Sequence, residues 1–391
     1  MRILMVAPEP IFEPRGTPLS VVGRLKAFSD MGHQVELVTY HLGENVHFPG
    51  VTIDRIPRVP GIGSIKIGPS LAKIPLDFFL CIKTFFKLLT RRYDLLHTHE
   101  EAGFWGTAMA SLFRIPHLYD MHSSLPQQLK NFRFTESRLL FKIFEGLEKR
   151  VLRNADGVIT ICPDLFDHVA NLFPDRGSIL IENVVDYGMI FGEEDTSETI
   201  RHSLNLSGKT VVLYTGTFEP YQGLDMLVHS AKLVLFRNTS AVFLLVGGHP
   251  DQVEQVRVLA VERGVADRVL FTGQVPPQTV SSYIRCADVL VSPRTAGTNT
   301  PLKIYAYLRS GVPIVATRLL THTQVLSDDV SVLTDPDADS FAEGILRILS
   351  DQKLAACISQ KAQELAEARY AYPAYLEKLQ RVLHQATGGT A

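Results

Sequence analysis

The stretch from Ser292 to Thr317, SPRTAGTNTPLKIYAYLRSGVPIVAT, carries the groups that hold a phosphate. Backbone N–H groups and hydroxyls are offered by four consecutive residues after a predicted strand, namely Gly297, Thr298, Asn299 and Thr300. Arg294 lies just upstream, and Lys303 falls in the first turn of the helix predicted to follow Pro301, so two cations are within reach of a diphosphate. The pattern predicts an anion site at a helix N-terminus; the alternative is a capped helix with solvated charges.

A second loop of this kind is YTGTFEPYQGL, from Tyr214 to Leu224. It follows a predicted strand and precedes a predicted helix, and Gly216 and Gly223 allow the backbone to approach a ligand closely. A glycine pair after a strand is also typical of a simple tight turn, so this loop alone leaves both interpretations open.

Alternating short apolar strands and helical patterns must position these loops. The predicted strands of the first half are 2–7, 34–39, 95–99, 117–120, 157–161 and 178–181, and those of the second half are TVVLYTG, AVFLLVGG, RVLFTGQV, DVLVSP and PIVAT. This order is typical of parallel sheets, and predicts two Rossmann-like α/β domains facing a central cleft at the carboxyl ends of their strands. We expect an N-terminal domain over 1–190, completed by a C-terminal helix over 373–391, and a second domain over 200–367, with a linker within 182–207.

Composition excludes several classes of protein. The 391 residues are 46% hydrophobic and 20% charged with a formal net charge of −2, which is typical of a globular chain and not of a nucleic-acid-binding one. The four cysteines are far apart, and no apolar run is long enough to span a bilayer, so we expect a cytoplasmic protein that contacts a membrane only peripherally, at its inner face.

The two loops, together with VLFTGQVPPQTVSSYIRCADVLVSP, resemble the carboxyl domain of the family 4 (group 1) glycosyltransferases, retaining enzymes of the GT-B fold. The segments RILMVAPEP, LKAFSDMGHQVELVT, DLLHTHE and LEKRVLRNADGVITIC extend the resemblance over nearly the whole chain. It implies transfer of a hexose from a nucleotide diphosphate sugar, bound by the second domain, to a lipid-linked or polysaccharide acceptor, bound by the first. No metal or other cofactor is implied, because the cations of the site stabilise the leaving diphosphate.

The resemblance also assigns roles to residues. It places His122, in YDMHSSLPQQL, against the transferred sugar, as a positioning group beside the cations Arg294 and Lys303. Beyond the four donors after the strand, the donor-site residues it implies are Gly16, Arg15, Gly216, Thr217, Gln222 and Gln274. His97 and His99 alternate on one strand, and we expect His99 to lie nearer the site and one of the two to be a core residue.

The sequence departs from the family at the donor site. The E-x7-E pair that contacts the sugar and the ribose aligns with Thr298 and Ala306, and the usual diphosphate-binding Arg and Lys align with Thr217 and Gln222. The chain is therefore interpreted as an atypical member without the acidic pair. A catalytically impaired nucleotide-sugar-binding or scaffold protein of the same fold remains the alternative, and a sugar-nucleotide epimerase is a weaker one.

Residues 55–92 hold eight basic side chains and one acidic one, Asp77. A helix predicted from Pro75 to Arg92 would carry Lys83, Lys87 and Arg91 on one stripe among apolar residues. It is either the crossover helix packed in the first domain or a helix in a bilayer interface that turns its basic residues toward anionic lipid. The basic segment 130–153 adds support to a lipid-facing first domain.

Overall fold

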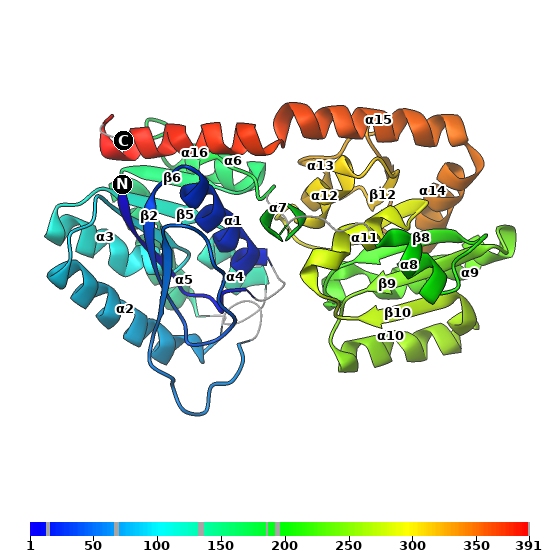
Figure 1. Ribbon diagram of the computed structural model, residues 1–391, viewed down its shortest axis with the longest axis horizontal. Helices are drawn as coiled ribbons and strands as arrows, with labels where there is room; N and C mark the ends of the chain where they lie inside the picture. The colour runs from blue at the N-terminus through cyan, green and yellow to red at the C-terminus, as the bar shows by residue number, and fades with distance from the viewer. Residues whose placement is uncertain (13–15, 66–69, 132–136, 185–186, 192–195, 390–391) are drawn as a thin grey trace. The chain divides into compact units, whose positions relative to one another are not determined.

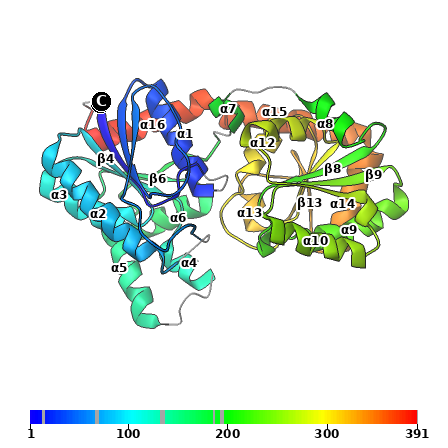
Figure 2. The same cartoon turned by 60° about the horizontal axis from the view of Figure 1, so that its bottom comes forward.

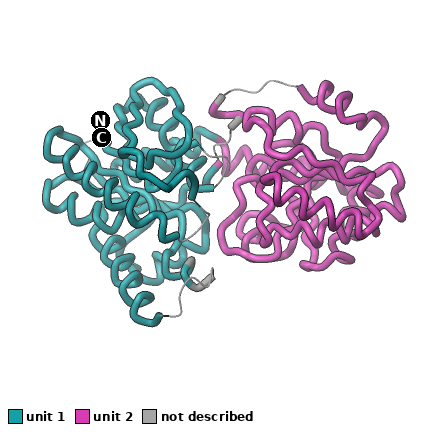
Figure 3. Tube along the Cα trace, turned by 90° about the horizontal axis from the view of Figure 1, so that it is seen from below, with its two compact units in different colours: residues 1–183, 372–391 teal, residues 184–371 magenta. Residues whose placement is uncertain are grey.

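The computed structural model describes residues 1–12, 16–65, 70–131, 137–184, 187–191 and 196–389. They form two compact units, of which unit 1 comprises residues 1–183 and 372–391 and unit 2 comprises residues 184–371 (Figure 3). The first boundary falls inside the segment 182–207 in which the sequence predicts a linker. That segment holds two short helices, α7 (Tyr187–Phe191) and α8 (Ser197–Ser203).

Unit 1 is built on a seven-stranded parallel sheet in the order β3-β2-β1-β4-β5-β6-β7 (Figure 1). Its strands are β1 (Arg2–Ala7), β2 (Gln34–Thr39), β3 (Val51–Arg55), β4 (Leu95–His99), β5 (His117–Met121), β6 (Gly157–Thr160) and β7 (Ile179–Leu180). Its helices are α1 (Gly16–Asp30), α2 (Lys73–Thr90), α3 (Ala102–Phe113), α4 (Leu125–Asn131), α5 (Arg138–Asn154), α6 (Pro163–Leu172) and the last helix α16 (Tyr372–Thr387).

The two faces of this sheet bury different side chains because residues alternate along each strand. Leu4 and Val6 of β1 pack with Leu76 and Leu80 of α2 in one apolar cluster. On strand β4, His97 points to the opposite face, where its ring lies 5.5 Å from the ring of Phe28 in α1. His97 and His99 of β4 and Asp120 of β5 thus lie on the face of the sheet that α1 covers, away from α2.

Unit 2 is built on a six-stranded parallel sheet in the order β10-β9-β8-β11-β12-β13 (Figure 2). Its strands are β8 (Thr210–Thr215), β9 (Ala241–Val246), β10 (Val269–Gly273), β11 (Val289–Ser292), β12 (Ile314–Thr317) and β13 (Val332–Thr334). Besides α7 and α8, its α-helices are α9 (Leu224–Arg237), α10 (Pro250–Glu262), α11 (Val280–Arg285), α12 (Lys303–Arg309), α13 (Leu320–Thr323), α14 (Ala338–Ser350) and α15 (Gln352–Arg369), and its 3-10 turns are Pro220–Gln222, Ala266–Arg268 and Pro277–Thr279.

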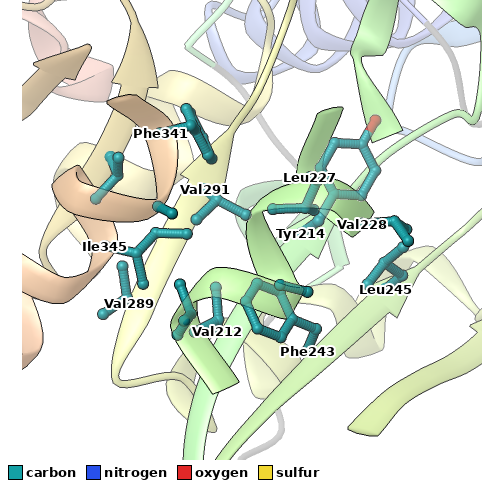
Figure 4. Close-up of a cluster of buried hydrophobic side chains, with 14 of the residues drawn as sticks. Val212, Tyr214, Leu227, Val228, Phe243, Leu245, Val289, Val291, Phe341 and Ile345 are labelled. Atoms are coloured by element: carbon teal, nitrogen blue, oxygen red, sulfur yellow. The ribbon is translucent and has the colours of Figure 1, made fainter. Parts of the chain in front are cut away.

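The core of unit 2 joins strands β8, β9 and β11 to helices α9 and α14 (Figure 4). Buried side chains include Val212, Phe243, Val291 and Phe341. Tyr214 belongs to the same cluster but carries a hydroxyl, which donates to the carbonyl oxygen of Thr217 at 2.6 Å. The aromatic ring therefore lies just beneath the loop that follows β8.

Two strands fall outside the set predicted from the sequence. β3 (Val51–Arg55) is an edge strand with half-buried side chains, and β13 (Val332–Thr334) has only three residues. Each is held by one parallel neighbour, β2 and β12 respectively. Neither carries an apolar run of its own, so pairing with that neighbour defines them.

Candidate functional site

Lys303 is the first residue of α12 and carries its ammonium group under the loop after β8. The Nζ atom lies 3.7 Å from the centroid of the Tyr214 ring, and a Cβ built on Gly216 would lie 3.2 Å from it. Nζ is buried and has no hydrogen-bond partner within the described residues. Burial, and then the charge of Arg294, hold the pKa of Lys303 well below its usual range. Lys303 is therefore a buried amine that lies against an aromatic face and has no hydrogen-bond partner in the part of the chain that the structure describes.

Arg294 follows β11 and lies over the ring of Tyr221, 5.0 Å from its centroid. Its Nη1 donates to the carbonyl oxygen of Asn299 at 2.7 Å and to Thr321 Oγ1 at 2.6 Å. Burial lowers its pKa, and its Nε is buried without a partner in the part of the chain that is described. Arg294 therefore shapes the 297–300 loop and also supplies positive charge beside Lys303.

The loop before α12 lies where the sequence predicts it. Helix α12 begins at Lys303 and has seven residues, so Lys303 lies in its first turn, and Gly297, Thr298, Asn299 and Thr300 belong to the loop that precedes it. The carbonyl oxygen of Thr298 accepts from Gln324 Nε2 at 2.5 Å, and that of Asn299 accepts from Arg294. Thr300 is buried, and its hydroxyl has no partner among the described residues.

Backbone geometry around Gly216 and Gly223 requires glycine. Gly216 has φ of 139° and Gly223 has φ of 71°. A Cβ on Gly223 would lie 2.0 Å from the carbonyl oxygen of Pro293, so no side chain fits between the two loops. The loops after β8 and β11 are thus packed backbone to backbone at the carboxyl edge of the unit 2 sheet.

The remaining unit 2 residues of the predicted donor site differ in exposure. Gln222 is buried, and its Oε1 has no partner among the described residues. Thr217 is half-buried, whereas Gln274 is exposed and lies 3.5 Å from His249 Nδ1. Glu219 accepts a hydrogen bond from Gln252 Nε2 at 3.1 Å.

In unit 1, Gly16 is the exposed first residue of α1, and a Cβ there would meet nothing within 4 Å. Arg15 lies outside the described residues. The structure thus gives Gly16 room for a ligand but no steric need for glycine.

His122 lies directly after β5 and is 2% exposed, so its ring is inside unit 1. Its Nε2 lies 2.9 Å from His99 Nδ1 and 3.3 Å from Asp120 Oδ1, and the two imidazoles are stacked with centroids 5.2 Å apart. Burial lowers the pKa of His122 to about 4, although Asp120 opposes this. His97 and His99 are both fully buried, and Asp120 Oδ2 lies 3.6 Å from His97 Nε2 and 3.8 Å from His99 Nδ1.

His97, His99 and Asp120 are close enough together to hold a metal ion. However, Asp120 Oδ2 already accepts a hydrogen bond from Arg24 Nε at 2.8 Å, and both side chains are fully buried. A dication at that oxygen would face the guanidinium at close range in a medium of low dielectric. The residues therefore fit an arginine–carboxylate–imidazole network better than a metal site.

The side chains of helix α2 form three stripes along the helix. Their contacts bear on whether α2 is a crossover helix packed in unit 1 or a helix in a bilayer interface. Its buried stripe packs on the sheet and consists of Leu76, Leu80, Thr84 and Leu88. Its basic stripe is paired with carboxylates of β2 and β3: Lys83 with Asp54, Lys87 with Asp54 and Glu36, and Arg91 with Glu36. Of the two alternatives, these contacts support the crossover helix packed in unit 1, because the charges of the basic stripe are neutralised there by Asp54 and Glu36.

The third stripe of α2 is apolar and exposed. Ile74, Phe78, Phe86 and Leu89 are 63%, 61%, 57% and 60% exposed, at spacings that place them on one side of the helix. Within the described residues no helix is long and apolar enough to cross a membrane. The helix also begins at Lys73, two residues before the predicted start at Pro75.

Two protein-family models together match most of the chain. Residues 209–351 match "Glycosyl transferases group 1", and residues 19–182 match "Glycosyl transferase 4-like domain". The phosphatidyl-myo-inositol mannosyltransferase of Mycolicibacterium smegmatis is 23% identical over 398 aligned residues, which cover 99% of this chain and 95% of that relative. The chain is a family 4 glycosyltransferase.

Further similarities of this glycosyltransferase agree with that assignment. The D-inositol 3-phosphate glycosyltransferase of Corynebacterium efficiens is 26% identical over 307 residues, 75% of this chain and 72% of the relative. The crystal structure of Anabaena HepE in complex with UDP matches with a TM-score of 0.76 at 19% identity, covering 98% of this chain and 99% of that one. The predicted GT-B fold with two Rossmann-like domains is confirmed.

Sequence reasoning missed several residues of the glycosyltransferase that surround its candidate groups. Tyr214 and Tyr221 lie under Lys303 and Arg294, and Thr321 holds the 297–300 loop. Arg24 and Asp120 surround the histidines. A tyrosine at the end of a strand gives no signal by itself, whereas the Asp-x-His spacing of Asp120 and His122 places both on one face of an extended segment.

Proposed function

We propose that this glycosyltransferase moves a hexose from a nucleotide diphosphate sugar to a lipid-linked or polysaccharide acceptor, with retention of configuration and without a metal ion. Lys303 and Arg294 of unit 2 hold the diphosphate, and His122 of unit 1 contacts the transferred sugar, as the family resemblance implies. The inner face of the membrane is the proposed place of action.

The buried, unpaired ammonium of Lys303 carries this proposal. A charged group inside a protein is strongly unfavourable unless an opposite charge or hydrogen bonds compensate it. Among the described residues, Lys303 has the face of Tyr214 and no hydrogen-bond partner, and the neighbouring charge, Arg294, is also positive. A diphosphate would supply the missing anion to both cations at once. The complexes of HepE with UDP and with UDP-glucose support a nucleotide sugar as the source of that diphosphate.

The same cations explain how transfer would proceed. As the sugar leaves, negative charge grows on the diphosphate, and fixed cations in a dry site stabilise that charge without having to reorganise. In a front-face transfer the leaving diphosphate helps to deprotonate the acceptor hydroxyl, so no side chain is needed as nucleophile. His122 then acts by positioning the sugar.

The exposed apolar stripe of α2 supports an acceptor at a membrane surface. Four large apolar side chains on one helix face are typical of a surface that enters the interface of a bilayer. Exposed Leu139 and Ile143 of α5 are accompanied by Arg138 and Lys142, which supply positive charge for anionic lipid. The phosphatidyl-myo-inositol mannosyltransferase among the relatives acts, by its name, on a lipid.

Two experiments test the proposal. Calorimetry against a panel of nucleoside diphosphates and their sugars identifies the donor; at a hundred times its dissociation constant it should stabilise the fold by about 2.7 kcal/mol. Radiolabelled transfer to a lipid extract of the source cells, analysed for anomeric configuration and repeated with a chelator, then tests the reaction. Binding of no member of the panel would overturn the donor assignment.

A second candidate, a catalytically impaired nucleotide-sugar-binding or scaffold protein, is favoured by one observation. Thr298 and Ala306 stand where the family has its acidic pair, and Glu219 is engaged by Gln252. This alternative shares the diphosphate site but predicts binding without turnover. A donor that binds tightly and is never transferred to any tested acceptor would favour it.

A further inference from the structure

A buried row of polar side chains connects the last helix of unit 1 to His122. Tyr375 of α16 accepts a hydrogen bond at its hydroxyl from Arg24 Nη1, and the guanidinium lies over the Tyr375 ring, 5.0 Å from its centroid. Arg24 Nε in turn donates to Asp120 Oδ2 at 2.8 Å, and the other oxygen of that carboxylate lies 3.3 Å from His122 Nε2. Arg24 and Asp120 are 0% exposed, Tyr375 is 4% exposed and His122 is 2% exposed.

Arg24 leaves the Asp120 carboxylate little freedom. Its three nitrogens contact three different elements, because Nη2 also donates to the carbonyl oxygen of Ile181 at 3.3 Å. The guanidinium is itself fixed at three points, and its single hydrogen bond to Oδ2 leaves Oδ1 as the carboxylate oxygen nearer the His122 ring. His122 Nε2 is hydrogen-bonded to His99 Nδ1 at 2.9 Å and lies 3.3 Å from Asp120 Oδ1, which has no hydrogen-bond partner among the described residues. A negative charge this close to Nε2 favours the tautomer that carries its proton on that nitrogen.

We propose that Arg24 and Tyr375 are positioning residues for sugar transfer: they fix Asp120, and Asp120 fixes the ring orientation and the tautomer of His122. The inference rests on the proposed function, which assigns His122 to the transferred sugar. Helix α16 then supports the site through Tyr375, in addition to covering the sheet of unit 1.

The charges around the ring follow from the same contacts. The groups that face His122 are Asp120, His99 and His97, with Arg24 behind the carboxylate. Although burial alone would raise the pKa of Asp120, Arg24 and the histidines hold it well below its usual range, so the carboxylate is ionised. Arg24 balances that charge and helps to keep His122 neutral, since its charge lowers the pKa of the ring. Loss of Arg24 would leave the carboxylate to be balanced by a proton on an imidazole.

Imidazole titration in the full chain tests the inference independently of turnover. His122 is assigned by the ring signal that is missing in His122→Gln, and ring signals are followed by NMR from pH 5 to pH 8. In the wild type His122 should remain neutral over this range. Arg24→Met should bring its midpoint up into the range, Arg24→Lys should restore most of the wild-type behaviour, and Tyr375→Phe should shift it in the same direction by less.

Tyr372→Phe is the matched control. Tyr372 joins the same two helices through a hydrogen bond of 2.6 Å from its hydroxyl to Asp30, and its ring stacks on that of Tyr375, but the described hydrogen bonds of Arg24 and Asp120 do not include its hydroxyl. A purely structural role of the helix pair would make the two tyrosine variants equivalent. Positioning predicts that only Tyr375→Phe changes the His122 titration.

Transfer kinetics provide the second readout. Arg24→Met should lower kcat about tenfold or more, while the KM for the donor changes by less than about twofold. The acid limb of the profile of kcat against pH should move to higher pH. Arg24→Lys should restore part of the lost kcat. If Arg24→Met does not fold, the two tyrosine variants carry the same test. An unchanged His122 titration in Tyr375→Phe, with Arg24→Met either unchanged or unfolded, overturns the inference whether or not transfer is found. A wild type that shows the predicted titrations without any transfer overturns only the proposed reaction.

Discussion

The Nζ atom of Lys303 lies 3.7 Å from the centroid of the Tyr214 ring, so a buried ammonium rests on an aromatic face at the carboxyl edge of the unit 2 sheet. A cation–π contact offsets part of the cost of burying the charge, about 2 kcal/mol where the pair is desolvated. It does not replace a counter-ion. Replacement of Lys303 should therefore have opposite effects on the stability of the unliganded protein and on its affinity for nucleoside diphosphates.

Lys303→Met should leave the unliganded protein as stable as the wild type or more stable, because a buried unpaired charge is replaced by an apolar chain of similar length. The same change should weaken nucleoside diphosphate binding roughly ten- to a hundredfold, since one charge-assisted contact is lost. Calorimetry and thermal unfolding measure the two effects. Lys232→Met, at an exposed position of α9, should change neither, and a strongly destabilised Lys303→Met would contradict the assignment.

Arg294→Lys separates charge from geometry. The lysine keeps a positive charge but cannot reproduce the two Nη1 hydrogen bonds to Asn299 and Thr321 that shape the 297–300 loop. We expect nucleoside diphosphate affinity to fall about tenfold or more, as measured by calorimetry. Affinity equal to that of the wild type would show that charge alone matters and that the loop is held without Arg294.

His122→Ala should lower kcat on the order of a hundredfold while nucleoside diphosphate binding stays nearly unchanged. The reason is that a contact with the transferred sugar matters most in the transition state, whereas the proposed ligands of the diphosphate, Arg294 and Lys303, belong to unit 2. Radiolabelled transfer, run side by side with wild type, provides the measurement. Equal rates would remove His122 from the reaction.

Phe78→Ser combined with Phe86→Ser should lower partitioning onto vesicles of phosphatidylcholine and phosphatidylglycerol by about tenfold or more, because each buried phenylalanine is worth about 1.5–3 kcal/mol. Sedimentation with the vesicles measures the bound fraction. Phe236→Ser is the control: this residue is 88% exposed on α9 of unit 2 and lies outside the apolar stripe. If all variants partition like wild type, α2 is not the membrane contact.

His322 should contribute to a loss of stability in mild acid. Burial lowers its pKa to about 3, whereas an unfolded chain has a value near 6.5, so between these values only the unfolded state takes up the proton. Stability therefore falls as the pH drops below about 6.5, by about 1.4 kcal/mol from this residue between pH 7.5 and 5.5.

Urea unfolding at the two pH values checks this expectation. His322→Asn should lose less stability than the wild type over the same interval, because the titrating group is gone. His202→Asn removes an exposed histidine of α8 and should leave the pH dependence unchanged. A His322→Asn variant with the full wild-type dependence would show that other groups dominate.

The alternation of apolar strands and helices predicted both sheets of this glycosyltransferase, because buried parallel strands read as short apolar runs whatever their neighbours are. The edge strand β3 and the three-residue strand β13 were not predicted from the sequence, because pairing with β2 and β12 defines them. Residue type and local spacing also singled out Arg294, Lys303 and the glycines of the two neighbouring loops, and their role in binding a diphosphate stays a prediction.

Only the tertiary structure decided what each charge faces. It paired the basic stripe of α2 with Asp54 and Glu36, left Lys303 against Tyr214 without an anion, and joined Arg24 to Asp120 across 96 positions of sequence. Such pairings depend on which strands become neighbours, and a sequence shows only which residues follow one another. The electrostatic state of a side chain is set by distances of a few ångströms in the folded chain, so the sequence named the charged groups and the fold determined their partners.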